Sequence, residues 1–135
     1  MNKPIFALAC ALTILPLTAS AAPSSSLTRT VHLEISDPGD PSGGITLDTS
    51  LVGERACSAF TLDDRTTRRK VTLCTSGSAE KPYLDVRLER GGAAGAVDVQ
   101  FSAATASGAR TRVGKIALDA KKSLEVHATL TTAAP

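Results

Sequence analysis

Hydrophobic and polar residues alternate along most of this chain, in short runs that Gly, Pro, Asp and Ser separate. Such alternation is typical of a β-strand with one buried face, and no helical pattern of useful length follows the first segment. The run LTRTVHLEI predicts a first strand with Val31, Leu33 and Ile35 on the buried face. About eight such strands joined by short turns predict an all-β domain. We expect a single antiparallel β-sandwich, immunoglobulin-like or similar, with a small closed β-barrel as the alternative.

Two later runs, YLDVRLER and AVDVQFSA, predict a hairpin that turns around residues 91–94. In that register Val86 lies opposite Val99 on the buried face, and Arg87 lies opposite Asp98 on the other face. Both pairs agree with cross-strand preferences, although each contributes little by itself. The alternation therefore predicts the pairing of these strands as well as their faces.

The last hairpin is predicted to turn at residues 120–122 and to set Ile116 opposite Val126. Gly114 interrupts the alternation between Val113 and Ile116, and a glycine inside a strand pattern often marks a bulge. We therefore expect a β-bulge at Gly114.

The start of the chain has the three-part order of a secretory signal peptide. A lysine precedes an apolar run at residues 5–17, and small residues in an A-x-A pattern follow. The run is too short to span a bilayer, and no later segment is long and apolar enough for a membrane anchor. We expect a periplasmic or secreted protein with a signal peptide at 1–21, a flexible leader at 22–28, a β-sandwich domain at 29–131 and a loose tail at 132–135.

Three cysteines are present, and Cys10 is expected to leave with the signal peptide; a lipoprotein would instead carry its lipid there. The remaining pair, Cys57 and Cys74, lies in a chain addressed to an oxidising compartment, where a disulfide is far more common than a metal site or a nucleophile. If these cysteines face each other across an antiparallel hairpin, Phe60 faces Val71 and the apolar residues share the opposite face. One register thus satisfies the disulfide and the hydrophobic pattern together.

The segment DDRTTRRK lies between these cysteines, at the tip of the predicted hairpin. Two readings remain open: a solvated tip that keeps a strand edge from aggregating, or a rigid basic finger that docks on an acidic partner. The tip lacks glycine, so a tight phosphate site is not expected. Alanine at Arg65, Arg68 and Arg69 is expected to leave stability nearly unchanged, because exposed charges contribute little. The candidate partner-binding residues are Arg65, Arg68, Arg69 and Lys70.

Composition narrows the possible functions. The chain holds 15 Lys and Arg against 13 Asp and Glu, a near balance that favours neither nucleic acid nor an anionic membrane. Aromatic residues make up 3% of the chain, which disfavours sites that stack sugars or bases. His32 and His127 fall on outward strand positions, and no recognisable arrangement of nucleophile, base and acid accompanies them. We expect no cofactor, no metal site and no enzymatic activity.

The segment ASGAR resembles part of the Ser-Gly-x-x-Tyr loop of periplasmic lysozyme inhibitors of the membrane-bound C-type family. The resemblance covers five residues, Thr111 stands where that motif has Tyr, and the cysteines are spaced differently. These departures argue against inhibitory contacts through Ser107 and favour a chance similarity of a turn rich in small residues.

Taken as a sequence, the chain predicts a non-enzymatic domain that binds another protein or envelope component, or that forms a structural part of an envelope assembly. An inhibitor of a secreted hydrolase such as lysozyme is one alternative, and a small hydrolase with an unrecognised site is the other. The first strand, which follows a flexible leader, and the irregular loop SDPGDPSGG are further places where a partner could bind.

Overall fold

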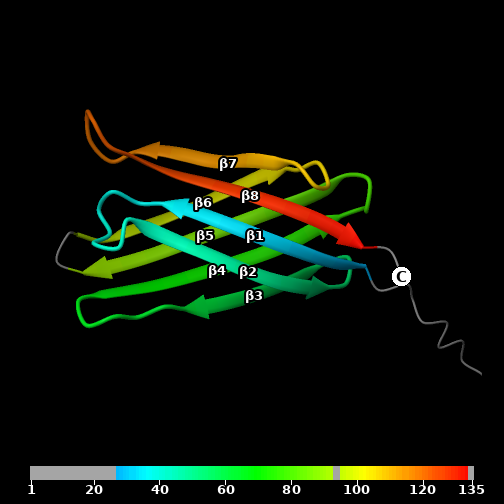
Figure 1. Cartoon of the computed structure of the whole chain (residues 1–135), viewed down its shortest axis with the longest axis horizontal. Coiled ribbons are helices and arrows are strands. Elements are labelled where there is room, and N and C mark those ends of the chain that lie inside the picture. Colours follow the sequence, from blue (N-terminus) through cyan, green and yellow to red (C-terminus); the bar gives the residue numbers. More distant parts are fainter. Residues whose placement is uncertain (1–26, 93–94, 134–135) are drawn as a thin grey trace, which may run out of the picture.

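The computed structural model describes residues 27–92 and 95–133. The eight strands are β1 (Thr28–Ser36), β2 (Gly44–Val52), β3 (Ala56–Thr61), β4 (Thr67–Gly77), β5 (Pro82–Gly92), β6 (Val97–Ala104), β7 (Arg110–Ala117) and β8 (Ser123–Ala133). They form two four-stranded antiparallel sheets, sheet A in the order β2-β1-β8-β7 and sheet B in the order β3-β4-β5-β6. Sheet A lies across sheet B in Figure 1. The predicted antiparallel β-sandwich of eight strands is confirmed.

The strands follow one another in an up-and-down order. Each pairs with the next one in the sequence except at β2/β3 and β6/β7, where the chain passes between the sheets, and β1 pairs with β8. The sheets therefore do not close into a barrel. An immunoglobulin domain has Greek-key connections and divides its strands differently between its sheets. This molecule is therefore an up-and-down β-sandwich, in which β2 and β3, and likewise β6 and β7, are not paired with each other. We call these two unpaired edges the seams.

The core between the sheets consists of aliphatic residues. Alternate positions of β1 point inward as expected, so that Val31, Leu33 and Ile35 are buried. Full burial of one such side chain contributes about 1.5–3 kcal/mol, which makes this core the main source of stability. The buried hydrophobic residues are Val31, Leu33, Ile35, Ile45, Leu51, Val71, Leu73, Leu84, Val86, Leu88, Val113, Leu124, Val126, Ala128 and Leu130.

The pairing of β5 with β6 differs from the expected register by two residues. Val86 lies opposite Phe101 instead of Val99. The strand β5 continues into the expected turn and pairs with β4 as far as Gly92, and the Gly95 N–H donates to the Gly92 carbonyl at 3.1 Å. A shift of two residues leaves every side chain on its expected face, so the alternation alone does not reveal it.

Arg87 and Asp98 form an ion pair despite this shift. Arg87 lies opposite Gln100, and its guanidinium reaches diagonally to the Asp98 carboxylate with hydrogen bonds of 3.1 Å and 3.0 Å. The expected contact is therefore present, although the expected register is wrong.

The pairing of β7 with β8 is also shifted by two residues. Ile116 lies opposite Leu124 instead of Val126. The register changes between Arg112 and Gly114, so the predicted irregularity at Gly114 is confirmed. The centre of the final turn therefore lies one residue earlier than the expected pairing of apolar residues placed it.

Gly114 also allows β6 and β7 to approach each other at their seam. A Cβ atom on Gly114 would lie 2.1 Å from Cδ1 of Phe101, so the phenyl ring occupies the space that any other side chain would need. Phe101 belongs to sheet B and Gly114 to sheet A. The glycine thus serves the packing of the two sheets as well as the bulge.

The strand β1 begins at Thr28 and β8 continues to Ala133, whereas the expected domain covers residues 29–131. The expected signal peptide at 1–21 lies outside the described residues. Within the part of the chain that the structure describes, no helix is long and apolar enough to cross a membrane.

Candidate functional site

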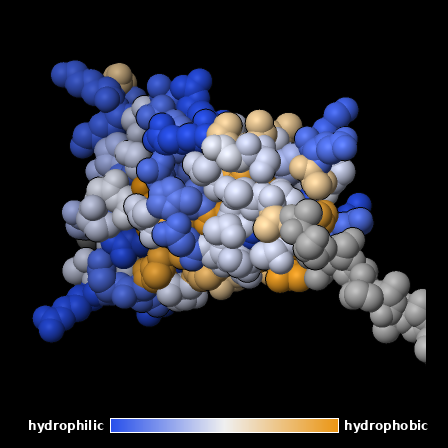
Figure 2. Space-filling view, turned by 45° about the vertical axis from the view of Figure 1, so that its right-hand side comes forward, coloured by the Kyte–Doolittle hydropathy of each residue, from blue (hydrophilic) through white to orange (hydrophobic). Residues whose placement is uncertain are grey.

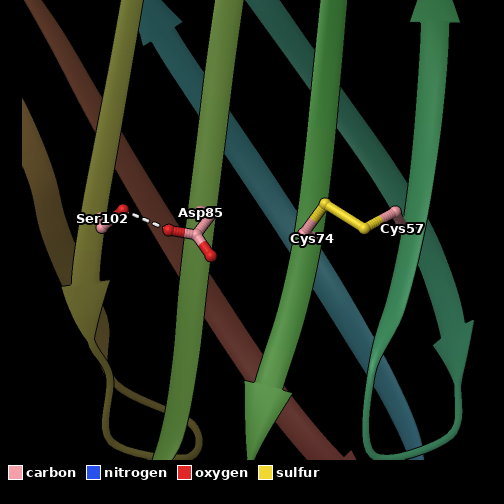
Figure 3. The surroundings of a disulfide bond; sticks show 4 residues. All are labelled: Cys57, Cys74, Asp85 and Ser102. Atoms are coloured by element: carbon pink, nitrogen blue, oxygen red, sulfur yellow. Dashed lines mark hydrogen bonds between the residues drawn. A yellow bond between two sulfur atoms is a disulfide. The ribbon is translucent and has the colours of Figure 1, made fainter.

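The cysteine hairpin of β3 and β4 folds in the predicted register. Cys57 lies directly opposite Cys74, and Phe60 lies opposite Val71. The two sulfur atoms are bonded, and the Cα atoms are 4.1 Å apart. The bond lies on the outer face of sheet B, in a row that continues across β5 and β6 (Figure 3). The expected disulfide across the hairpin is confirmed.

Asp64 orders the backbone at the tip of this hairpin. Its carboxylate accepts hydrogen bonds from the N–H groups of Thr66 and Thr67, each at 2.8 Å, and from the Thr66 hydroxyl at 3.2 Å. The Asp64 N–H donates to the Thr67 carbonyl at 3.0 Å. These bonds, led by the one from the Thr66 N–H, lower the pKa of Asp64. An aspartate that bonds the backbone two and three residues ahead is typical of a well-defined turn.

Arg69 does not belong to the solvated tip. Its side chain points inward from β4 and is 8% exposed, and its Nε and Nη2 atoms donate to the buried Asp40 carboxylate, the latter at 2.5 Å. Nη2 also donates to Asp64 at 3.0 Å. Hydrogen bonding between Arg69 and Asp40 lowers the pKa of the carboxyl and raises that of the guanidinium. The expectation that Arg69 is an exposed charge is therefore wrong, because this arginine anchors the tip to the loop between β1 and β2.

A second buried ion pair joins the same irregular loop to sheet B. Arg90 of β5 donates from Nε and Nη2 to Asp37, and the two side chains are 3% and 2% exposed. Nη1 of Arg90 donates to the Gly95 carbonyl at 2.9 Å. We call residues 37–43 the strap, because they cross one end of the sandwich and are tied to sheet B through Asp37 and Asp40.

The alternation of hydrophobic and polar residues indicates that Arg69 and Arg90 are buried, although their charge suggests exposure. Residues two apart in a strand share a face. Arg69 precedes Val71 by two positions, and Arg90 follows Leu88 by two positions, and both neighbours are buried. Assigning DDRTTRRK to the solvent by its charge overlooked this relation.

Three basic residues of the hairpin tip are exposed: Arg65, Arg68 and Lys70. None of them forms an ion pair with any residue of the ranges 27–92 and 95–133. Arg68 and Lys70 border a hollow of about 500 Å³, which Gly91 leaves open because a Cβ there would meet nothing within 4 Å. The tip thus combines exposed cations with a hollow of mixed charge, whose acidic lining residues are Asp63, Glu89 and Asp98.

His32 and His127 lie on the outer face of sheet A, as predicted. The His32 Nδ1 atom is 2.6 Å from the Asp48 carboxylate, and this hydrogen bond raises the pKa of His32. Glu34 lies opposite His127 and 3.7 Å from the His32 Nε2 atom. No group of three His, Cys, Asp or Glu side chains among the described residues is placed to hold a metal ion.

Parts of a catalytic triad occur on opposite faces of the molecule. The Ser102 hydroxyl donates to the Asp85 carboxylate on the outer face of sheet B (Figure 3). The pair of His32 and Asp48 lies on the outer face of sheet A. A Ser-His-Asp hydrolase needs the hydroxyl within hydrogen-bond reach of the imidazole, so these two pairs do not combine into one site.

The ASGAR segment lies in the connection between β6 and β7, at the end of the sandwich opposite the basic tip. The Ser107 hydroxyl accepts a hydrogen bond from the Thr132 N–H at 3.2 Å, and the Gly108 N–H donates to the Leu130 carbonyl at 2.8 Å. These bonds tie the connection to β8. Ser107 therefore has a local structural contact that does not depend on any partner.

Few large hydrophobic side chains of the described residues are exposed. Figure 2 shows a face on which hydrophobic residues appear only as small, separate patches. The exposed large hydrophobic residues of the described ranges, which come from four different segments, are Val52, Leu62, Tyr83 and Ile116. A partner that recognises such a surface depends on polar and charged contacts more than on one apolar patch.

No known family model, curated protein or solved structure matches this chain. Its function is therefore inferred from its own residues.

Proposed function

We propose that this protein is a non-enzymatic binding domain of the periplasm or the extracellular space, and that it docks on an acidic protein of the envelope through the tip of its cysteine hairpin. The docking residues are Arg65, Arg68 and Lys70. One observation carries the proposal: these three exposed cations, which have no ion-pair partner in the described ranges, are presented on a backbone that is held in place.

Three sets of contacts fix the tip before a partner binds. The disulfide joins the two strands below the tip, Asp64 bonds the turn, and Arg69 ties β4 to Asp40 on the strap. Association normally costs free energy for ordering loops and side chains, and a loop that is already rigid avoids part of that cost. The buried contacts of Arg69 exclude it from the docking set proposed from the sequence, and give it a role in positioning the other three residues.

Charge favours an acidic protein as the partner. Arginine is enriched among the residues that dominate protein interfaces, and complementary charge accelerates encounter and selects the partner. The near balance of charge over the whole chain argues against a general affinity for polyanions, so a local cluster of cations is the better basis for recognition. The small, scattered apolar patches of the surface support the same view.

The test compares two variants of the exported, disulfide-bonded protein that carry the same change in net charge. The tip variant has glutamine at three positions: Arg65, Arg68 and Lys70. The control variant has glutamine at three other exposed basic positions: Lys81, Lys121 and Lys122. Both should unfold at the wild-type temperature, because exposed charges contribute little to stability.

Each protein is immobilised, exposed to envelope extract and washed, and the retained proteins are identified by mass spectrometry. Wild type and control should retain the same acidic protein in near-equal amount, the tip variant should not, and the affinity for that purified protein should fall steeply with salt. Equal retention by all three would contradict the proposal. If the retained protein is a hydrolase that loses activity on binding, inhibition replaces simple docking as the function.

A further inference from the structure

Arg29 is a buried cation at the end of the sandwich opposite the basic tip. It lies on β1, and its side chain is 0% exposed. Nη1 donates to the Glu54 carbonyl at 3.1 Å, and Nη2 donates to the Gly77 carbonyl. Within the part of the chain that the structure describes, no carboxylate forms an ion pair with it. This sets Arg29 apart from the other two buried arginines, since an unpaired buried charge is strongly unfavourable.

Buried polar atoms without a hydrogen-bond partner gather near this guanidinium. They are the Arg29 Nε atom and the hydroxyls of Thr75 and Thr132. Thr132 lies directly opposite Arg29 in the pairing of β1 with β8, and Thr75 precedes by two positions the glycine that accepts the bond from Nη2. Folded proteins contain few such atoms, and their presence often marks a bound ion or water.

A hollow of about 460 Å³ lies at the same end of the sandwich. It is lined by Glu54, Arg55, Gly77 and Ser78, and two of these residues supply the carbonyls that accept from Arg29. Two guanidinium groups and one carboxylate leave the region with a net positive charge. The Ser78 hydroxyl accepts from the Lys81 N–H at 3.1 Å, so its hydrogen is available to donate.

We propose that this hollow binds a small oxyanion, such as a carboxylate or phosphate group. Arg55 and Ser78 contact the anion at the rim, and the positive charge of the buried Arg29 guanidinium, which donates to the carbonyls of two lining residues, attracts it from behind. A guanidinium has five N–H donors, of which Arg29 uses two within the described structure, and arginine suits the planar oxygens of such ligands. The anion supplies the negative counter-charge that Arg29 lacks within the described residues.

Nuclear magnetic resonance of ¹⁵N-labelled protein tests this site directly, through the Nε–Hε signals of the arginine side chains. Sodium acetate and sodium phosphate are titrated separately at constant ionic strength, and an Arg29→Lys variant assigns the signal. The Arg29 signal should shift saturably with at least one anion, and Arg87, which is exposed on sheet B, should not. A response to one anion only supports the site and identifies its preferred ligand.

Two exposed substitutions keep the test independent of folding. Arg55→Gln should weaken the apparent affinity by about tenfold, as expected for the loss of one charge-assisted hydrogen bond. Arg112→Gln, which removes an exposed arginine from sheet A, should leave the affinity unchanged. If the Arg29 signal responds to neither anion, or responds equally in wild type and Arg55→Gln, the proposed oxyanion site is wrong.

Discussion

The buried ion pair of Arg69 and Asp40 should contribute far more to stability than an exposed pair of the same chemistry. The variant Arg69→Met keeps much of the aliphatic volume but deprives the Asp40 carboxylate, whose side chain is 0% exposed, of its cation. Removing one partner of a buried pair costs about 3–5 kcal/mol. Asp40 retains hydrogen bonds from the Ser42 N–H at 2.9 Å and hydroxyl at 2.8 Å, so we expect the lower part of that range, about 3 kcal/mol.

The pair of Arg87 and Asp98 provides a matched control. Here too an arginine binds one aspartate through Nε and Nη2, at 3.1 Å and 3.0 Å, but the side chains are 47% and 59% exposed. The variant Arg87→Met should lose only a small fraction of what Arg69→Met loses, because solvent screens exposed charges. The two pairs share their chemistry and their bonding pattern, and differ chiefly in burial.

Urea unfolding followed by far-ultraviolet circular dichroism measures both variants, since the chain has no Trp. The midpoint of Arg69→Met should fall well below that of wild type with an unchanged slope, whereas Arg87→Met should stay close to wild type. Adding Asp40→Leu to Arg69→Met should recover part of the loss, because apolar residues often replace a buried ion pair at little cost. Equal losses for Arg69→Met and Arg87→Met would refute the reasoning that burial sets the energy.

Three further results are expected. A thiol assay on the denatured, unreduced exported protein should find Cys57 and Cys74 oxidised, and two free thiols would contradict the disulfide. Reduction should lower the free energy of unfolding by roughly 3 kcal/mol, because the disulfide joins residues 17 apart. The pKa of His32, followed by nuclear magnetic resonance, should exceed 6.5 in wild type and return toward 6.5 in Asp48→Asn. Because folding raises this pKa, the stabilisation is present below pH 6.5 and is lost as the pH rises through the pKa of the folded state. Equal His32 pKa values in wild type and Asp48→Asn would show that Asp48 is not the cause. Gly114→Ala should lower the free energy of unfolding by about 1–3 kcal/mol, because the new methyl group meets the Phe101 ring, and adding Phe101→Leu should restore part of that loss. An unchanged unfolding midpoint in Gly114→Ala would show that the ring moves aside without cost.

Alternation was sufficient to predict the β-sandwich class and the inward face of β1, and together with the two cysteines it predicted the register of their hairpin. In that hairpin the disulfide and the apolar face impose two independent conditions, and one register meets both. The pairings of β5 with β6 and of β7 with β8 have no such second condition. Turn contacts such as the bond from the Gly95 N–H to the Gly92 carbonyl decide those registers, and a shift of two residues leaves the hydrophobic pattern unchanged.

The contacts of the strap could not be paired from the sequence. Asp37 and Arg90 are 53 positions apart, and Asp40 and Arg69 are 29 positions apart, so their meeting depends on how the two sheets are stacked. The composition of the loop indicated irregular backbone correctly, but proline and glycine say nothing about where a neighbouring aspartate points. The sequence did indicate that both arginines point inward, because each lies two positions from a buried apolar residue of its strand.

Successive residues of the segment TTRRK point to opposite faces of β4. Those on the inward face stabilise the fold, and those on the outward face are available to a partner. Arg69 lies on the inward face of β4 and bonds the strap, while Arg68 and Lys70 lie on the outward face beside the hollow. Neighbouring basic residues of one strand therefore have different consequences when they are changed. Loss of an outward cation should weaken docking and leave the fold intact, whereas loss of Arg69 should release the strap and weaken docking only because the tip is no longer held in position.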